Sequence, residues 1–430
     1  MSHSLLSRFG FSDGMRTGST MANNIIVTSL IAGAAGFNES SLILFSGLSS
    51  FFGFLLEVPL AYLADERGWR KAVRNSFLLD FVILIFLMIA VWAGSVEKSL
   101  VFYTAMILRS LSIAFANGFE RGAYQAAYLK WFDQKQSESE SKKSSKLFID
   151  SFRYSVPYRI FIPVLSCLAF FTLQKYFSVL LSSIICLSIL GLSKLAGPWR
   201  DLDLSQVKND TPEPTQKLPF YSVFMSSQST FPDLTIYAYA WLVRNFIHAV
   251  LIAKSYHLFR DLGFSMETIF AGGSVMALTI NFLNLFVSGL FFESLRKWTK
   301  IDKIRFIGSA VILILSFMST LVFLLSDQII LQLCVLFIFC LTSLTFSDAV
   351  RFEIESDVKN ISKNGYLASW LSAGNLLQYL AYAFIASIAS YLGGNASLVI
   401  IFSAFTLIGL GVVFLKKKVS LSTLSVQSRI

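Results

Sequence analysis

Charged residues are scarce in this sequence. Only 14% of its 430 residues are Asp, Glu, Lys or Arg, whereas 55% are hydrophobic and the mean hydropathy is +0.64. An average soluble domain has about 25% charged residues. The composition therefore excludes an ordinary soluble protein and predicts a polytopic membrane protein in contact with the lipid bilayer.

Cysteine and histidine are rare as well, with four and three residues respectively. The cysteines all lie in apolar runs without a CxxC pair, and the histidines are too scattered to form a ligand set with them. We therefore predict neither a metal site nor a cofactor.

Signatures of enzymes and of ATP-driven pumps are missing too. The sequence contains no GxxxxGK[ST] phosphate loop, no HExxH motif and no arrangement of Ser, His and Asp typical of a hydrolase. The net charge of +10 is spread in short stretches between apolar runs, which argues against a nucleic-acid-binding face. We expect a protein that is not an enzyme, does not bind nucleic acid and is not driven directly by ATP.

What the sequence has in abundance is apolar runs of about 20 residues, the length that crosses a bilayer as a helix. The first run is the weakest and could instead be a signal peptide, although its removal would leave an odd number of spans. The twelve predicted transmembrane helices are 12–34, 41–64, 73–94, 99–129, 147–172, 176–196, 232–257, 266–292, 304–325, 329–350, 366–391 and 396–415.

Basic residues cluster in every second loop. The loop after the second span holds Arg67, Arg70, Lys71 and Arg74, whereas the loops of the other set offer only Lys98, Lys175 and Arg260. By the positive-inside rule, both termini are predicted to be cytoplasmic.

A polar break divides the chain near its middle. The stretch 197–220 holds four of the eight prolines, a composition typical of a linker. We predict an N-terminal six-helix bundle at 1–196, a cytoplasmic linker at 197–231, and a C-terminal six-helix bundle with a cytoplasmic tail at 232–430. A shift of 228 residues places Asp65 over Glu293 and Glu120 over Asp348, as a duplicated six-helix unit predicts.

The stretch EVPLAYLADERGWRK, residues 57–71, resembles the signature loop of the major facilitator superfamily, which has the pattern Gly-x-Leu-Ala-Asp-Arg-x-Gly-Arg-Lys between spans 2 and 3. The Glu-Val-Pro start is similar to a bacterial branch in which Glu-Ile/Val-Pro precedes the loop, and Arg109 is similar to the arginine of a second family motif. The matching residues are Leu63, Ala64, Asp65, Gly68 and Arg70, and the departures are Ala61, Glu66 and Trp69.

This resemblance implies an all-α membrane protein with twelve transmembrane helices in two pseudo-symmetric six-helix bundles that rock around a central cavity. It also implies a conformational latch on the cytoplasmic side. Alternatively, the charged residues of this stretch form a salt-bridged loop whose only role is to set the membrane topology of the chain. The latch residues are Asp65, Gly68, Arg70 and Lys71, with Glu293 as the counterpart in the second half.

Ionisable residues within spans are costly and usually face a partner or a wet cavity. Arg109 and Glu120 are eleven residues apart, within about 20° on one helix face, while Arg121 points about 100° away from Glu120. The candidate substrate and coupling residues are Asp13, Arg16, Glu57, Arg109, Glu120, Arg244, His248, Asn281, Asn284, Asp348, Asn375 and Gln378.

Glu57 has two interpretations. It is either a protonatable coupling group, because a buried acid holds its proton more tightly, or a structural carboxylate paired with an arginine of a neighbouring helix. The sequence leaves both open.

These features predict a secondary transporter, monomeric and in the bacterial inner membrane. It would export a small organic solute by alternating access, coupled to protons through Glu57, Glu120 or Asp13. One alternative is proton-driven uptake of an anionic nutrient or siderophore, recognised by the basic residues of spans 4 and 7. Another is a membrane receptor or enzyme without a transport cycle.

Overall fold

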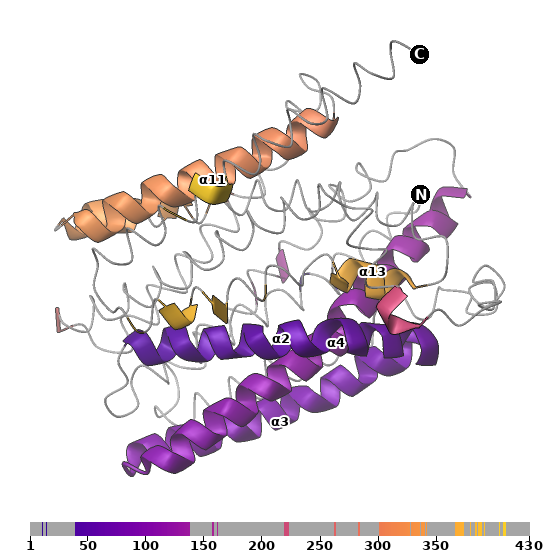
Figure 1. Cartoon of the computed structure of the whole chain (residues 1–430), viewed down its shortest axis with the longest axis horizontal. Coiled ribbons are helices and arrows are strands. Elements are labelled where there is room, and N and C mark those ends of the chain that lie inside the picture. Colours follow the sequence, from indigo (N-terminus) through magenta and orange to yellow (C-terminus); the bar gives the residue numbers. More distant parts are fainter. Residues whose placement is uncertain are drawn as a thin grey trace.

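The structure is a computed structural model that describes residues 39–137, 301–326, 328–335, 337–339 and 366–373, and single residues or short pieces elsewhere, among them 219–222, 379, 383–384 and 386–388. Its helices with assigned bounds are α2 (Glu39–Arg67), α3 (Trp69–Ser95), α4 (Ser99–Ser137), α11 (Ile301–Leu325) and α13 (Leu367–Ala373). Figure 1 shows α2, α3 and α4 lying together along the long axis of the molecule, with α13 beside α2 and α4 near one end.

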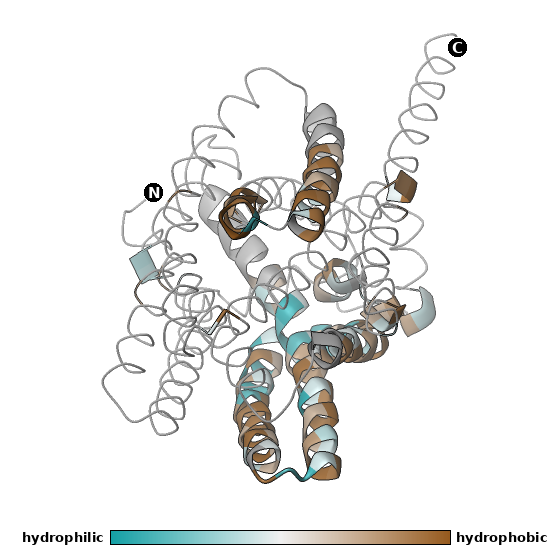
Figure 2. Ribbon diagram, turned by 90° about the vertical axis from the view of Figure 1, so that its left-hand side faces the viewer, coloured by the Kyte–Doolittle hydropathy of each residue, from teal (hydrophilic) through white to brown (hydrophobic). Residues whose placement is uncertain are grey.

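Three of these helices are long and apolar enough to cross a membrane, over Gly47–Arg67, Trp69–Gly94 and Ser99–Tyr124. Hydrophobic residues cover most of their length (Figure 2). These three helices confirm the predicted spans 41–64, 73–94 and 99–129. The predicted span 304–325 is helical as α11, whereas the twelve-helix count and the two-bundle layout extend beyond the described residues and stay predictions.

The expected loop between the second and third spans is almost entirely helical, which corrects its predicted length. α2 continues to Arg67 and α3 begins at Trp69, so Arg70, Lys71 and Arg74 lie in the first turns of a helix. The single residue between the helices is Gly68, whose φ of 98° and ψ of 131° suit only glycine. One glycine thus makes the whole turn.

Helices α3 and α4 pack antiparallel through an apolar core. Phe102, Met106 and Ala105 of α4 lie against Leu87 and Ala90 of α3, and Phe45 of α2 joins the same cluster. Met106 and Ala90 are completely buried. The opposite faces carry exposed apolar side chains such as Leu78 and Ile85, as expected of helices that face lipid.

The second contact of this unit is with residues far along the chain. α13 packs against both α2 and α4, and Gly47 of α2 faces Ala386 so closely that a Cβ on Gly47 would lie 2.6 Å from the Ala386 Cβ. α11 lies away from α3 and α4 in both views (Figures 1 and 2). The α2 and α4 faces that meet α13, Tyr379 and Ala386 therefore form the contact on which the site is built.

Replacing Gly68 with alanine should destabilise the protein through backbone strain alone. No atom lies within 4 Å of the position that its Cβ would occupy, so a clash makes no contribution. Holding a non-glycine residue in this region costs about 1–3 kcal/mol. We expect a lower apparent melting temperature for purified Gly68→Ala and little change for Arg67→Ala, an exposed neighbour. Equal melting temperatures for the two variants would contradict this explanation of the turn.

Candidate functional site

The carboxylate of Asp65, in the last turn of α2, accepts hydrogen bonds from the start of α13, about 300 residues later in the chain. The backbone N–H groups of Ala368 and Ser369 donate to it at 3.1 and 2.8 Å, and the Ser369 hydroxyl donates at 2.6 Å. A single carboxylate therefore joins two parts of the chain that the sequence places far apart.

The start of α13 needs such a partner. The first N–H groups of a helix have no acceptor within it, and its N-terminus carries a partial positive charge. The helix begins after Tyr366, whose carbonyl accepts from the Trp370 N–H at 3.1 Å but whose side chain is not one of the usual N-terminal caps. Asp65 supplies the cap from another helix.

Trp69, which follows Gly68 at the start of α3, binds the same carboxylate. Its indole Nε1–H donates to Asp65 at 2.8 Å, one helical turn further along the chain. The sequence comparison singled out Trp69 as a departure from the family pattern, which has arginine there. In this protein an uncharged donor, the Trp69 indole, binds the same carboxylate that caps α13.

Deeper along α2, Glu57 is completely buried and lies opposite a cation of α4. The Arg121 guanidinium is 3.9 Å from the Glu57 carboxylate, and the Arg121 side chain is 29% exposed. Arg121 also donates a hydrogen bond to the Tyr379 hydroxyl and lies 5.7 Å from the centre of that ring. Glu57 of α2, Arg121 of α4 and Tyr379 thus form one polar group.

Glycines bring the three segments close enough for these contacts. A Cβ on Gly118 would lie 3.2 Å from the Glu57 Cα and 2.8 Å from the Leu60 side chain. A Cβ on Gly122 would overlap the Ala368 carbonyl oxygen and lie 2.7 Å from the Ser372 Oγ. Gly118, Arg121 and Gly122 recur at i, i+3 and i+4, so one face of α4 contacts both α2 and α13.

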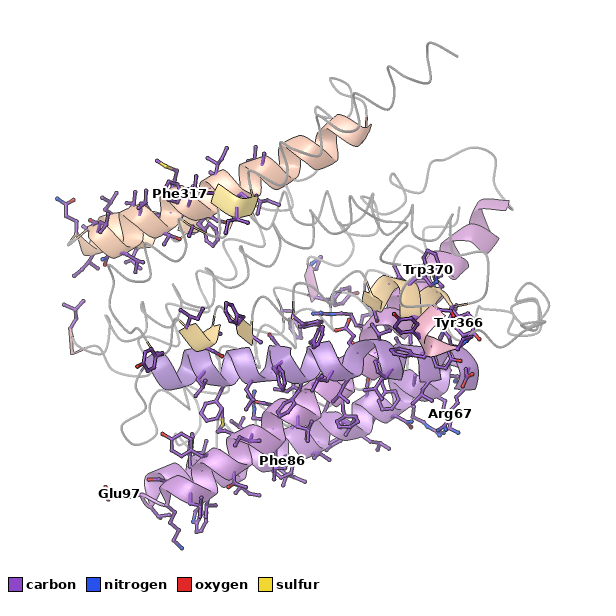
Figure 3. All side chains as sticks on the ribbon, viewed as in Figure 1. Arg67, Phe86, Glu97, Phe317, Tyr366 and Trp370 are labelled. Carbon is purple, nitrogen blue, oxygen red and sulfur yellow. The ribbon has the colours of Figure 1, made fainter. Side chains whose placement is uncertain are left out.

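The remaining predicted latch residues in the described part are surface residues. Arg70 and Lys71 are exposed in the first turn of α3, beyond the Gly68 turn. Figure 3 shows Arg67 at the same end of the helices as Tyr366 and Trp370, with Glu97 at the opposite end. The structure thus places the whole Asp65 to Lys71 run at the end where α13 is capped, while Glu293 lies outside the described residues.

Arg109 and Glu120 lie on α4, about 16 Å apart along the helix axis at 1.5 Å per residue. Glu120 is buried, and the Arg109 Nε is a buried donor without a hydrogen-bond partner in the part of the chain that the structure describes. Outside the described residues lie the predicted positions Asp13, Arg16, Arg244, His248, Asn281, Asn284, Asp348, Asn375 and Gln378.

Sequence reasoning missed Tyr379, Ser369 and the contact that Arg121 makes. The sequence places Arg121 with Arg109 and Glu120 as cavity-lining residues but does not indicate it as the partner of Glu57, and nothing local distinguishes Tyr379 or Ser369. The spacing of Gly118, Arg121 and Gly122 is the signal that could have indicated Arg121, because small residues in membrane helices mark the faces where helices approach closely.

Among solved structures, a crystal structure of an aspartate-to-alanine mutant of the nucleoside transporter NupG is similar to this chain with a TM-score of 0.55. The similarity covers 95% of this chain and 97% of that chain, at 11% sequence identity. No protein-family model and no curated protein sequence matches the chain. The likeness establishes the fold, and together with the apolar helices it describes a multi-pass integral membrane protein whose fold is similar to that of NupG.

Replacing Asp65 with asparagine should loosen α13 from α2 and α4. Hydrogen bonds to a charged group contribute about 1.5–3 kcal/mol, and a loss of about 1.4 kcal/mol changes an equilibrium tenfold. The reporter is a cysteine at Ser372, which is 1% exposed and faces Gly122, in a protein freed of its native cysteines. We expect Asp65→Asn to raise its labelling by a water-soluble maleimide tenfold or more.

The matched control is Glu97→Gln, which removes the same charge at the opposite end of the helices. It should leave the labelling rate at Ser372→Cys unchanged. Equal rates in Asp65→Asn and in the unsubstituted protein would contradict the capping contact.

Arg121 and Glu57 should behave as a coupled pair in thermal unfolding. Arg121→Met removes the cation nearest to a buried carboxylate, and breaking a fully buried pair costs about 3–5 kcal/mol, reduced here because solvent reaches Arg121. We expect a clear drop in melting temperature for Arg121→Met and a partial recovery in Glu57→Gln/Arg121→Met. If the two substitutions lower the melting temperature additively, the residues do not interact.

Proposed function

We propose that the protein is a secondary active transporter of the major facilitator fold, which moves a small organic solute by alternating access. The capping of α13 by Asp65 is the observation that carries this proposal. A carboxylate that holds a helix start from another part of the fold can release it as a unit, and such a contact suits a fold that alternates between two packings.

In this proposal α2, α3 and α4 belong to an N-terminal six-helix bundle, and α11 and α13 belong to a C-terminal bundle. The Asp65 end faces the cytoplasm, where the basic residues Arg67, Arg70 and Lys71 favour it by the positive-inside rule. The packing of α13 on α2 and α4 then corresponds to a state closed toward the cytoplasm. Opening it requires Asp65 to leave Ala368 and Ser369.

We assign proton coupling first to Glu57. Its carboxylate is buried, and the nearby Arg121 is also bonded to Tyr379 across the contact between the proposed bundles. Protonation of Glu57 would remove its attraction for Arg121 and so alter a contact between the moving parts. Glu120, buried in the same helix as Arg121, and Asp13 are the other coupling candidates.

Export of the solute is the proposed direction, supported by the Glu-Val-Pro start that resembles a branch of transporters often associated with efflux. Arg109 favours a second candidate, the uptake of an anionic nutrient. A buried guanidinium nitrogen without a hydrogen-bond partner among the described residues suits an anionic group of a substrate.

The substrate can be sought by thermal shift. A ligand at 100 times its Kd stabilises the folded state by about 2.7 kcal/mol, which raises the melting temperature. The panel should hold organic anions, zwitterions and amphiphiles, and also nucleosides because of the similarity to NupG. Arg109→Met should abolish the shift given by an anionic ligand and spare the shift given by an uncharged one.

Proteoliposomes loaded with a compound found in this way test the transport cycle. We expect a pH gradient to drive accumulation by the unsubstituted protein. Glu57→Gln should lose the gradient-driven accumulation but keep exchange of labelled for unlabelled solute, because exchange needs no net proton movement. Solute movement that ignores both the pH gradient and Glu57→Gln would rule out coupling through this residue, and a complete lack of solute movement would favour a receptor.

A further inference from the structure

Three aromatic rings from three distant parts of the chain lie next to the Asp65 cap. Tyr62 of α2 stacks on Tyr366, with ring centres 5.3 Å apart and an angle of 6° between the planes. Phe220 meets Tyr62 edge to face, with centres 6.0 Å apart and an angle of 84°. Both arrangements are those that the charge distribution of aromatic rings favours.

Phe220 belongs to the stretch predicted from sequence to be a linker. A simple linker does not require an aromatic residue packed on a transmembrane helix, and its composition gave no indication of such a contact. Its neighbour Tyr221 is 67% exposed and is not part of the three-ring cluster, whereas Phe220 is 39% exposed. The linker therefore contacts α2 at a particular side chain.

The ring contact and the carboxylate contact depend on each other through short stretches of backbone. Tyr62 and Asp65 are three residues apart on α2, hence on one face of that helix. Tyr366 is 4% exposed and immediately precedes α13, whose Ala368 and Ser369 N–H groups bind Asp65. Moving α13 away from α2 breaks the stack and the cap together.

We propose that the Phe220 segment is a clasp that holds α13 against α2 and so sets how readily this side of the transporter opens. Phe220 fixes the Tyr62 ring, and the Tyr62 ring in turn provides the surface on which Tyr366 stacks. The clasp gives the linker a role in the cycle, because displacing Phe220 from Tyr62 favours opening. This inference rests on the proposed alternating-access cycle.

Maleimide labelling of a cysteine at Ser372, in a protein freed of its native cysteines, tests the clasp without any knowledge of the substrate. Phe220→Ala should raise the labelling rate about two- to tenfold, the range expected from one aromatic contact. Phe220→Tyr keeps the ring, and Tyr221→Ala removes an exposed ring of the same segment, so both should label at the unsubstituted rate.

Ser110→Cys provides the control for unfolding. Ser110 is completely buried on α4, and its hydroxyl faces the Phe45 carbonyl of α2 at 3.5 Å. Its labelling should stay unchanged in Phe220→Ala, because the α2 to α4 contact does not open. A parallel rise at Ser110→Cys would mean general loss of packing and would contradict the clasp.

Comparison with Asp65→Asn separates this inference from the proposed function. If Asp65→Asn raises labelling at Ser372→Cys and Phe220→Ala does not, the clasp is wrong and the opening movement stands. If neither substitution raises it, both the movement and the clasp are wrong. If Phe220→Ala alone opens the contact while no solute moves in proteoliposomes, the clasp holds and the transport proposal fails.

Discussion

The described part of this molecule depends on one electrostatic requirement, the need of the first N–H groups of α13 for an acceptor. A local capping side chain or water meets this need at an exposed helix start, but here the helix start lies against two other helices. Asp65 meets it with a carboxylate that accepts four hydrogen bonds in all, three from α13 residues and one from Trp69. The positions of α2, the Gly68 turn and α13 relative to one another follow from this contact.

Glu57 and Asp65 are both acids of α2, but their carboxylates have different partners. Asp65 accepts hydrogen bonds from the backbone of α13, the Ser369 hydroxyl and the Trp69 indole, so its carboxylate is held by four donors. Glu57 lies 3.9 Å from Arg121, near the outer limit of an ion pair, and that arginine has a second partner in Tyr379. The proposed cycle uses this difference, with a fully hydrogen-bonded carboxylate for closing and a weakly paired one for coupling.

The sequence predicts best those features that depend on residues close together in the chain. Hydropathy over about 20 residues defined the three spans that the structure describes, because lipid contact depends on composition alone. The motif indicated Asp65 and Gly68 but not what Asp65 binds, since Ala368 and Ser369 follow more than 300 residues later. The sequence allows Glu57 to pair with an arginine of a neighbouring helix but does not indicate Arg121, because helix spacing alone gives no reason to prefer the face that carries Gly118 and Gly122. The contact of Phe220 with Tyr62 could not be predicted, because a single aromatic residue in a polar segment forms no periodic pattern.

The close approach at Gly122 and Gly47 affects how the contact can separate. Gly122 meets the Ala368 backbone and Gly47 meets the small Ala386 side chain, so no long side chain fills the space at either position. Such a surface is smooth, and its free energy is concentrated in a few polar contacts at its edge instead of being spread over many interlocked side chains. Helices with this kind of contact can move apart as rigid bodies, and the barrier to that movement is set by very few groups.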